Sequence, residues 1–249
     1  MPVEFERLGK VGVLRLRRPD CANALDRRSL QRLWTLQESI RKDPRIHVLV
    51  TMGHGRGFCA GSDLKELSRL TPDEMMASQL LESRVCRNFL SLPQPTIAAI
   101  HGYAIGAGLF LAAHHDIRVA AASSRLALPE VKLGWNPTFG MQRLSQVAGR
   151  TAATNWLVSG EEFTASSPQA QMFLTRVVAE DSEALETSLE IAKRLASLPA
   201  RGLAAIKHAL WHQTRHALEE ADSLEARLFR DCLTSAPARA SLRKFRKSE

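Results

Sequence analysis

Short segments with β-strand character alternate with helical segments along most of this 249-residue chain. The strand candidates are brief runs of branched and other apolar residues, at 11–16, 45–51, 96–100, 117–120, 125–128 and 175–178. Runs of this length that are bounded by glycine, proline or polar residues are typical of strands. Because strands that alternate with helices are the pattern of layered α/β proteins, the sequence predicts an α/β core.

The helices are predicted from apolar spacing and from helix-breaking residues. An amphipathic helix begins after a capping residue, either Asn23 or Asp26, and a second helix spans about 73–90. The prolines of LPQP, at 92–95, end the second helix because a residue before proline avoids helical backbone angles. The segment 182–234 shows helical spacing throughout and no strand pattern.

Composition excludes several classes of protein. Hydrophobic residues make up 45% of the chain and charged residues 24%, which is ordinary for a folded water-soluble domain and excludes disorder and coiled coil. No apolar run approaches the about 20 residues of a membrane-spanning helix, so we expect no membrane partner. The four cysteines are far apart and form no CxxC pair, which argues against a metal site and against disulfides. With no secretory signal at the start, we expect a cytoplasmic protein with reduced thiols.

The net charge of +8 is the one unusual global property. Basic residues are concentrated in the first sixty residues and in the tail 239–247. Such a charge suits a polyanionic partner, which includes nucleic acid, an acidic membrane surface or a phosphorylated cofactor, and it also serves solubility alone. Composition does not decide between these readings.

Two glycine-containing turns each follow a strand candidate and open a helix. They are GRGFCAGSDLKEL at 55–67 and HGYAIGAGL at 101–109. Glycine lets the backbone approach a ligand closely, and a helix N-terminus presents unpaired N–H groups. Neither turn fits the dinucleotide-binding fingerprint. Two such turns that aim their amides at one point would form an oxyanion hole.

Both turns, together with LALPEVKLGWNP at 126–137 and RPDCANALD at 18–26, resemble the enoyl-CoA hydratase/isomerase family, the crotonase superfamily. The resemblance covers nearly the whole chain. It implies a crotonase-like spiral of ββα repeats at 1–195 and a C-terminal helical region at 196–249 that builds a homotrimer or a dimer of trimers. It also implies an acyl-CoA thioester as the ligand and no cofactor, because CoA is part of the substrate.

The resemblance assigns site residues by position. It implies that the backbone N–H groups of Ser62 and Ala107 hold the thioester oxygen. We expect Asp63 to cap a helix. We expect Tyr103 to pack within the second glycine turn, where it also lies among the positions that border the substrate. The positions expected to bind substrate are Ala22, Ala24, Ala60, Gly61, Ser62, Asp63, Leu64, Tyr103, Gly106, Phe110, Pro129 and Thr138.

The acid–base residues then suggest the reaction. The family's hydratases use two glutamates, and the positions that match them here hold Phe110 and Glu130. Phe110 transfers no proton, which disfavours two-glutamate hydration. Moving a double bond from the 3,4 to the 2,3 position needs one carboxylate, so the sequence predicts an enoyl-CoA isomerase with Glu130 as catalytic base and acid. Burial beside Phe110 is expected to raise the pKa of Glu130.

Four alternatives stay open: hydration by Glu130 alone, another reaction of the superfamily such as decarboxylation, hydrolysis, dehalogenation or lyase chemistry, a catalytically inactive CoA-binding protein, and RNA binding. The basic segments favour RNA binding, and the lack of an aromatic-rich RNA motif argues against it.

Other chemically suggestive residues are given structural or supporting roles. We expect His101, His114 and His115 to pack or cap helices, and Cys59 to be an inert thiol. Trp135, Asn136 and Thr138 either shape the acyl pocket or pack. Arg18, Arg27 and Arg28 are the candidates for contacts with the CoA phosphates.

Overall fold

The computed structural model describes residues 1–247 and contains two sheets with helices around them. The larger sheet has the strand order β1-β2-β3-β4-β6-β9, in which β1 is antiparallel to β2 and the other neighbours are parallel. Its strands are β1 (Val3–Leu8), β2 (Val11–Leu16), β3 (Val48–Gly53), β4 (Thr96–Ile100), β6 (Ile117–Ala121) and β9 (Arg176–Val178). The smaller sheet has the order β5-β7-β8 and consists of β5 (Tyr103–Ile105), β7 (Arg125–Ala127) and β8 (Phe163–Thr164).

Ten α-helices lie within residues 1–247. They are α1 (Arg27–Lys42), α2 (Leu64–Leu67), α3 (Pro72–Ser91), α4 (Ala107–Ala113), α5 (Glu130–Leu133), α6 (Met141–Ala148), α7 (Arg150–Ser159), α8 (Asp181–Ala196), α9 (Ala200–Leu233) and α10 (Ala236–Lys247). Short 3-10 turns lie at Pro19–Cys21 and Pro168–Ala170. No helix of the described chain is both long enough and apolar enough to cross a membrane.

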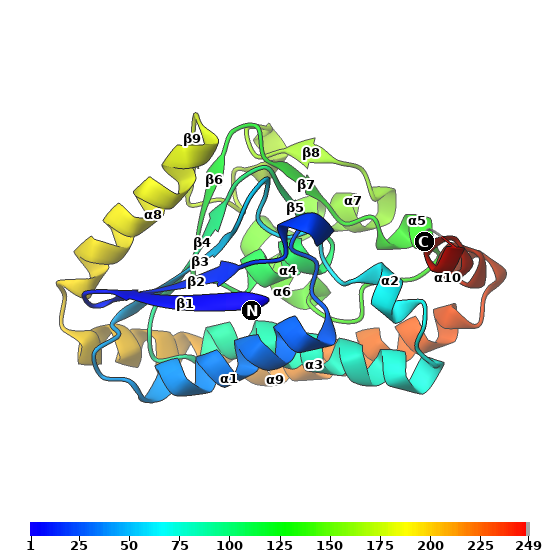
Figure 1. Ribbon diagram of the computed structural model, residues 1–249, viewed down its shortest axis with the longest axis horizontal. Coiled ribbons are helices and arrows are strands. Elements are labelled where there is room, and N and C mark those ends of the chain that lie inside the picture. Colours follow the sequence, from blue (N-terminus) through cyan, green and yellow to red (C-terminus); the bar gives the residue numbers. More distant parts are fainter. Residues whose placement is uncertain (248–249) are drawn as a thin grey trace.

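Helices cover the larger sheet on both faces (Figure 1). Alternate side chains of its central strands, such as Val13, Val50 and Ile97, pack with α8 in one apolar cluster. The other set, such as Leu14 and Ile100, belongs to the main core with α1, α3 and α4. Burial on both faces explains why these strands read as continuous apolar runs. The predicted α/β fold class is confirmed.

Several local predictions are confirmed and others are corrected. The helix α1 is capped by Asp26, which accepts a hydrogen bond from the Ser29 N–H at 2.7 Å, and not by Asn23. The strand predicted at 45–51 begins later, at Val48, because the Asp43 side chain accepts from the Arg45 N–H and holds a turn there. The sequence patterns missed β1, β5 and β8; of these, β5 and β8 have only three and two residues.

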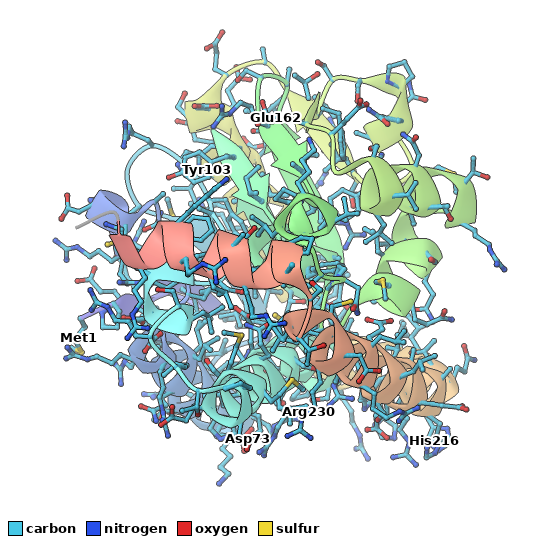
Figure 2. All side chains as sticks on the ribbon, turned by 90° about the vertical axis from the view of Figure 1, so that its right-hand side faces the viewer. Met1, Asp73, Tyr103, Glu162, His216 and Arg230 are labelled. Atoms are coloured by element: carbon cyan, nitrogen blue, oxygen red, sulfur yellow. The ribbon has the colours of Figure 1, made fainter. Side chains whose placement is uncertain are left out.

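The last two helices are integral to the described fold. The helix α9 packs along α3 and α6, and α10 contacts α2, α5 and α9. Figure 2 shows α10 lying across α2 and α5, and it shows Asp73 of α3 beside Arg230 of α9, with which it forms an ion pair. The division at 195/196 and the trimer stay predictions. Residues 248–249 of that predicted region lie outside the described part.

The buried Lys207 links α9 to α3 and to the segments that precede β4 and β6. The Lys207 ammonium donates hydrogen bonds to the carbonyl oxygens of Phe89 and Gln94, at 2.7 and 2.8 Å, and to the Asp116 carboxylate at 2.6 Å. Burial lowers its pKa, and Asp116 opposes that effect.

We therefore expect Lys207→Met to destabilise the protein by about 3–5 kcal/mol, because it removes the cation that pairs with the Asp116 carboxylate and the donor to two buried carbonyls. Urea unfolding measures this loss. The exposed Arg201 on the same helix supplies the control, since Arg201→Met should change the free energy of unfolding by less than about 0.5 kcal/mol. Equal effects of the two substitutions would show that Lys207 does not anchor α9.

Candidate active site

The two glycine turns of the sequence lie against each other in the fold. The backbone of Cys59 in the first turn forms a parallel β-bridge with Ala104 of β5. The Ile105 N–H donates a hydrogen bond to the Cys59 carbonyl at 3.0 Å. The approach leaves no room for side chains. A Cβ on Gly61 would lie 2.7 Å from the Ile105 oxygen, and one on Gly108 would lie 2.3 Å from the Cys59 oxygen. Glycine at both positions is therefore required for the contact.

The contact brings the two predicted oxyanion donors together. A Cβ on Gly61, the residue before Ser62, would lie only 3.1 Å from the Ala107 nitrogen. The residue before Ala107 is Gly106, whose φ of 54° favours glycine, and Ala107 is the first residue of α4. Within the described chain, the backbone N–H groups of Ser62 and Ala107 donate to no protein acceptor. Two unpaired amides on adjacent turns are the arrangement that a developing oxyanion needs.

A cavity of about 630 Å³, including its open mouth, begins at these amides. Its walls come from both turns, from α3, from the segment around α5 and from the C-terminal helices. The lining residues are Ala60, Gly61, Ser62, Leu64, Leu67, Met75, Gln79, Glu82, Ile105, Gly106, Ala107, Phe110, Pro129, Glu130, Leu133, Trp135, Asn136, Pro137, Thr138, Phe139, Phe229 and Leu242. Most of them are apolar, which suits an acyl chain.

Ten of the predicted site positions therefore line one cavity, as do Trp135 and Asn136. Four others do not. Ala22 and Ala24 lie in the neighbouring segment that pairs with the first turn, where Ala22 accepts from the Ala60 N–H. Asp63 caps α2 through the Glu66 N–H at 3.1 Å, and Tyr103 lies against Gly57. Contact of these four with CoA stays a prediction.

Glu130 is the predicted base, and its carboxyl group lies beside Gly106 in the second glycine turn. The residue is partly exposed, but its Oε2 atom is shielded from solvent and has no hydrogen-bond partner among the described residues. Its Oε1 atom would be 3.0 Å from a Cβ on Gly106. Burial raises its pKa to about 7. A carboxyl group with that pKa exchanges its proton readily at neutral pH.

Phe110 occupies the position that, according to the family resemblance, holds a second glutamate in hydratases. Its side chain is buried and packs on Phe139, with 5.7 Å between the ring centroids. A Cβ on Gly140 would lie 2.6 Å from the Phe110 ring, so the glycine makes room for it. The position that would hold a second catalytic carboxylate is therefore occupied by an apolar ring.

A second carboxyl group nevertheless lines the cavity, and the motif analysis missed it. Glu82 of α3 is 1% exposed and accepts hydrogen bonds from the Ser62 hydroxyl at 2.8 Å and from the Gln79 amide at 3.1 Å. Burial is the main cause that raises its pKa to about 8, and the nearby charge of Glu130 adds to the effect. The available signal was helical spacing: Gln79 and Glu82 fall in the buried stripe of α3 with Met75, Cys86 and Phe89.

Comparisons with known proteins agree with this geometry. The model of the family described as enoyl-CoA hydratase/isomerase matches residues 6–248. This chain belongs to that family. It is 34% identical over 226 residues, 90% of the chain and 87% of the relative, to the 2,3-dehydroadipyl-CoA hydratase of Escherichia coli. It is also 32% identical over 220 residues, 86% of the chain and 84% of the relative, to the 1,2-epoxyphenylacetyl-CoA isomerase of that organism.

The fold is that of the crotonase superfamily. The crystal structure of an enoyl-CoA hydratase from Bacillus anthracis matches 100% of this chain and 97% of its own with a TM-score of 0.82 and 26% identity. The expected family, fold and enzyme class are therefore confirmed. The protein is a crotonase-family enzyme that acts on acyl-CoA.

The other candidate side chains of this crotonase have structural roles. Burial raises the pKa of the Cys59 thiol to about 12 and lowers the pKa values of His114 and His115 to about 3, so none of the three is charged at neutral pH. The two histidines contact backbone carbonyls of α4. His101 contacts the Gly55 carbonyl. The described residues contain no cluster suited to a metal ion.

The buried carboxyl groups make stability depend on pH with a defined sign. The pKa values of Glu82 and Glu130 in the fold, about 8 and about 7, exceed the ordinary value of 4.5, so the folded state binds more protons between these limits. The stabilisation is complete below about pH 4.5 and is lost as the pH rises to 8. We expect the double variant Glu82→Gln/Glu130→Gln to show a smaller fall in the free energy of unfolding from pH 5 to pH 8.

Urea unfolding at the two pH values measures that fall. The variant Glu162→Gln, at an exposed position, should keep the wild-type pH dependence. A double variant with the full wild-type fall would show that these carboxyl groups do not have raised pKa values.

Proposed function

We propose that this enzyme is an enoyl-CoA isomerase that moves a double bond from the 3,4 to the 2,3 position of the acyl chain. The observation that carries the proposal is the buried Oε2 atom of Glu130, which has no partner among the described residues and lies in the cavity beside the turn at Gly106, with phenylalanine at position 110. Glu130 takes a proton from C2, and the electrons of that C–H bond pass into a dienolate. The electrons return to form the 2,3 double bond as C4 gains a proton.

In this proposal the amides of Ser62 and Ala107 hold the thioester oxygen, on which the negative charge of the dienolate develops. The apolar lining receives the acyl chain. No cofactor takes part, because CoA belongs to the substrate. Arg18 is engaged with Asp63 at 2.9 Å and with the Ala24 carbonyl at 2.6 Å, which leaves the exposed Arg27 and Arg28 for the CoA phosphates. A cytoplasmic homotrimer or dimer of trimers completes the proposal.

Hydration of a 2-enoyl-CoA is the second candidate. The observation that favours it is Glu82, because a second carboxyl group in the cavity supplies a proton donor that the motif lacks. A relative that is named a hydratase is consistent with it. A side-by-side assay of 3-enoyl-CoA isomerisation and 2-enoyl-CoA hydration over several chain lengths separates the two.

The variant Glu130→Gln should keep acyl-CoA binding and lose turnover by at least about 10²-fold, because the amide keeps the shape of the carboxyl group but accepts no proton. Steady-state kinetics together with calorimetric binding of acyl-CoA measure both. The matched control is Glu225→Gln, which removes a buried glutamate that does not line the cavity and whose pKa is also raised to about 7. A Glu130→Gln enzyme at the wild-type rate would refute Glu130 as the base.

The variant Ala107→Pro tests the second oxyanion donor. Proline removes the N–H group and is well tolerated at the first residue of a helix, which is the position of Ala107 in α4. Loss of one such donor should cost about 2.7–4 kcal/mol of transition-state stabilisation, or about 10²–10³ in kcat. Ala107→Ser, which retains the N–H group, is the control. Equal rates for the two variants would mean that the Ala107 amide does not hold the oxyanion.

A further inference from the structure

The hydrogen bonds around Glu82 all converge on one of its two oxygens. The Thr138 hydroxyl donates to Gln79 Oε1 at 2.8 Å, which fixes the orientation of the Gln79 amide. The NH₂ group of Gln79 then donates to Glu82 Oε2, and the Ser62 hydroxyl donates to the same atom. Since Oε2 already receives two donors, it is the acceptor oxygen of the carboxyl group.

The other oxygen, Oε1, is left without a partner. It is shielded from solvent, and no described residue donates to it or accepts from it. A buried polar atom without a protein partner is costly, and a bound water, ion or ligand or a catalytic role accounts for such atoms. If Glu82 is neutral, its proton lies on Oε1 and has no protein acceptor. Glu130 presents the same feature through its Oε2, and both residues line one cavity from different elements, α3 and α5.

We propose that Glu82 is a second proton-transfer residue of this active site, and that it protonates C4 of the dienolate after Glu130 has taken the proton from C2. The inference rests on the proposed isomerisation and adds the residue that completes it. Glu82 on α3 thus supplies a second carboxyl group, which α4 lacks because it carries phenylalanine at position 110.

The step balances without a further reagent. The C2–H bond breaks, its proton goes to Glu130, and its electrons form the dienolate. When the 2,3 double bond forms, the former 3,4 double bond provides the electrons for a new C4–H bond with the proton from Glu82. Glu130 ends protonated and Glu82 ionised. Exchange with water restores both, because a net proton has moved only from one carboxyl group to the other.

The protonation states agree with these roles. The pKa of Glu82, at about 8, keeps it protonated at neutral pH as an acid requires. The pKa of Glu130, at about 7, leaves a substantial ionised fraction for a base. Burial that raises both pKa values towards neutrality lets each carboxyl group give up or take a proton at neutral pH.

Hydrogen exchange in D₂O tests the two residues separately. Uptake of deuterium at C2 of hexanoyl-CoA, a saturated thioester, requires only the base next to C2. Uptake at C4 of 2-hexenoyl-CoA requires removal and return of a C4 proton, which the proposal assigns to Glu82. Mass spectrometry and NMR of the recovered thioesters give both rates for the wild type, Glu82→Gln, Glu130→Gln and Glu225→Gln.

We expect Glu82→Gln to lose exchange at C4 by at least about 10²-fold and to retain exchange at C2, with the opposite result for Glu130→Gln. The glutamine at 82 keeps an acceptor for Ser62 and Gln79, so the surrounding network is preserved. The control Glu225→Gln should match the wild type in both.

Wild-type exchange at C4 that survives Glu82→Gln would overturn the assignment of Glu82 and leave Glu130 intact. Absence of C4 exchange in the wild type, with exchange at C2 present, would also overturn the assignment of Glu82 and leave that of Glu130 intact. Exchange at C4 that depends on Glu82, without exchange at C2, would refute the role of Glu130 instead. Loss of both exchanges in Glu82→Gln, with binding of acyl-CoA also lost, would show that Glu82 only maintains the pocket.

Discussion

The close contact between the two glycine turns is the constraint on which the site depends. Gly61 and Gly108 let backbone meet backbone where any side chain would collide with Ile105 or Cys59. The parallel strands β3 and β4 place the starts of both turns at the same edge of the sheet. As a result, the N–H groups of Ser62 and Ala107 face one cavity. Because these N–H groups belong to the backbone, an oxyanion hole built from them would not depend on the side chains at 62 and 107.

Burial of acid groups is the second determinant of the chemistry. The helices α9 and α10 pack beside the cavity and add Phe229 and Leu242 to its lining. Exclusion of water raises the pKa values of Glu82 and Glu130 towards neutrality. The C-terminal helices therefore help to enclose, within one chain, the cavity that these carboxyl groups line.

The sequence predicted the features that local patterns encode. Strands such as Val11–Leu16 and Thr96–Ile100, the capping of α2 by Asp63 and the two turns were evident from apolar runs, glycines and the family motifs. Short strands such as β5 and β8 were missed because pairing in three dimensions, and not composition, creates them. Glu82 was missed because its importance arises from contacts with Ser62, twenty residues away, across the fold.

The central claim is that the thioester oxygen binds between the amides of Ser62 and Ala107, with the acyl chain between the carboxyl groups of Glu130 and Glu82. A crystal structure of the enzyme with hexanoyl-CoA tests this claim directly. The account predicts the thioester oxygen about 2.7–3.1 Å from both nitrogens, with C2 near Glu130 and C4 near Glu82. A thioester oxygen bonded to neither amide, or an acyl chain outside the cavity, would contradict it.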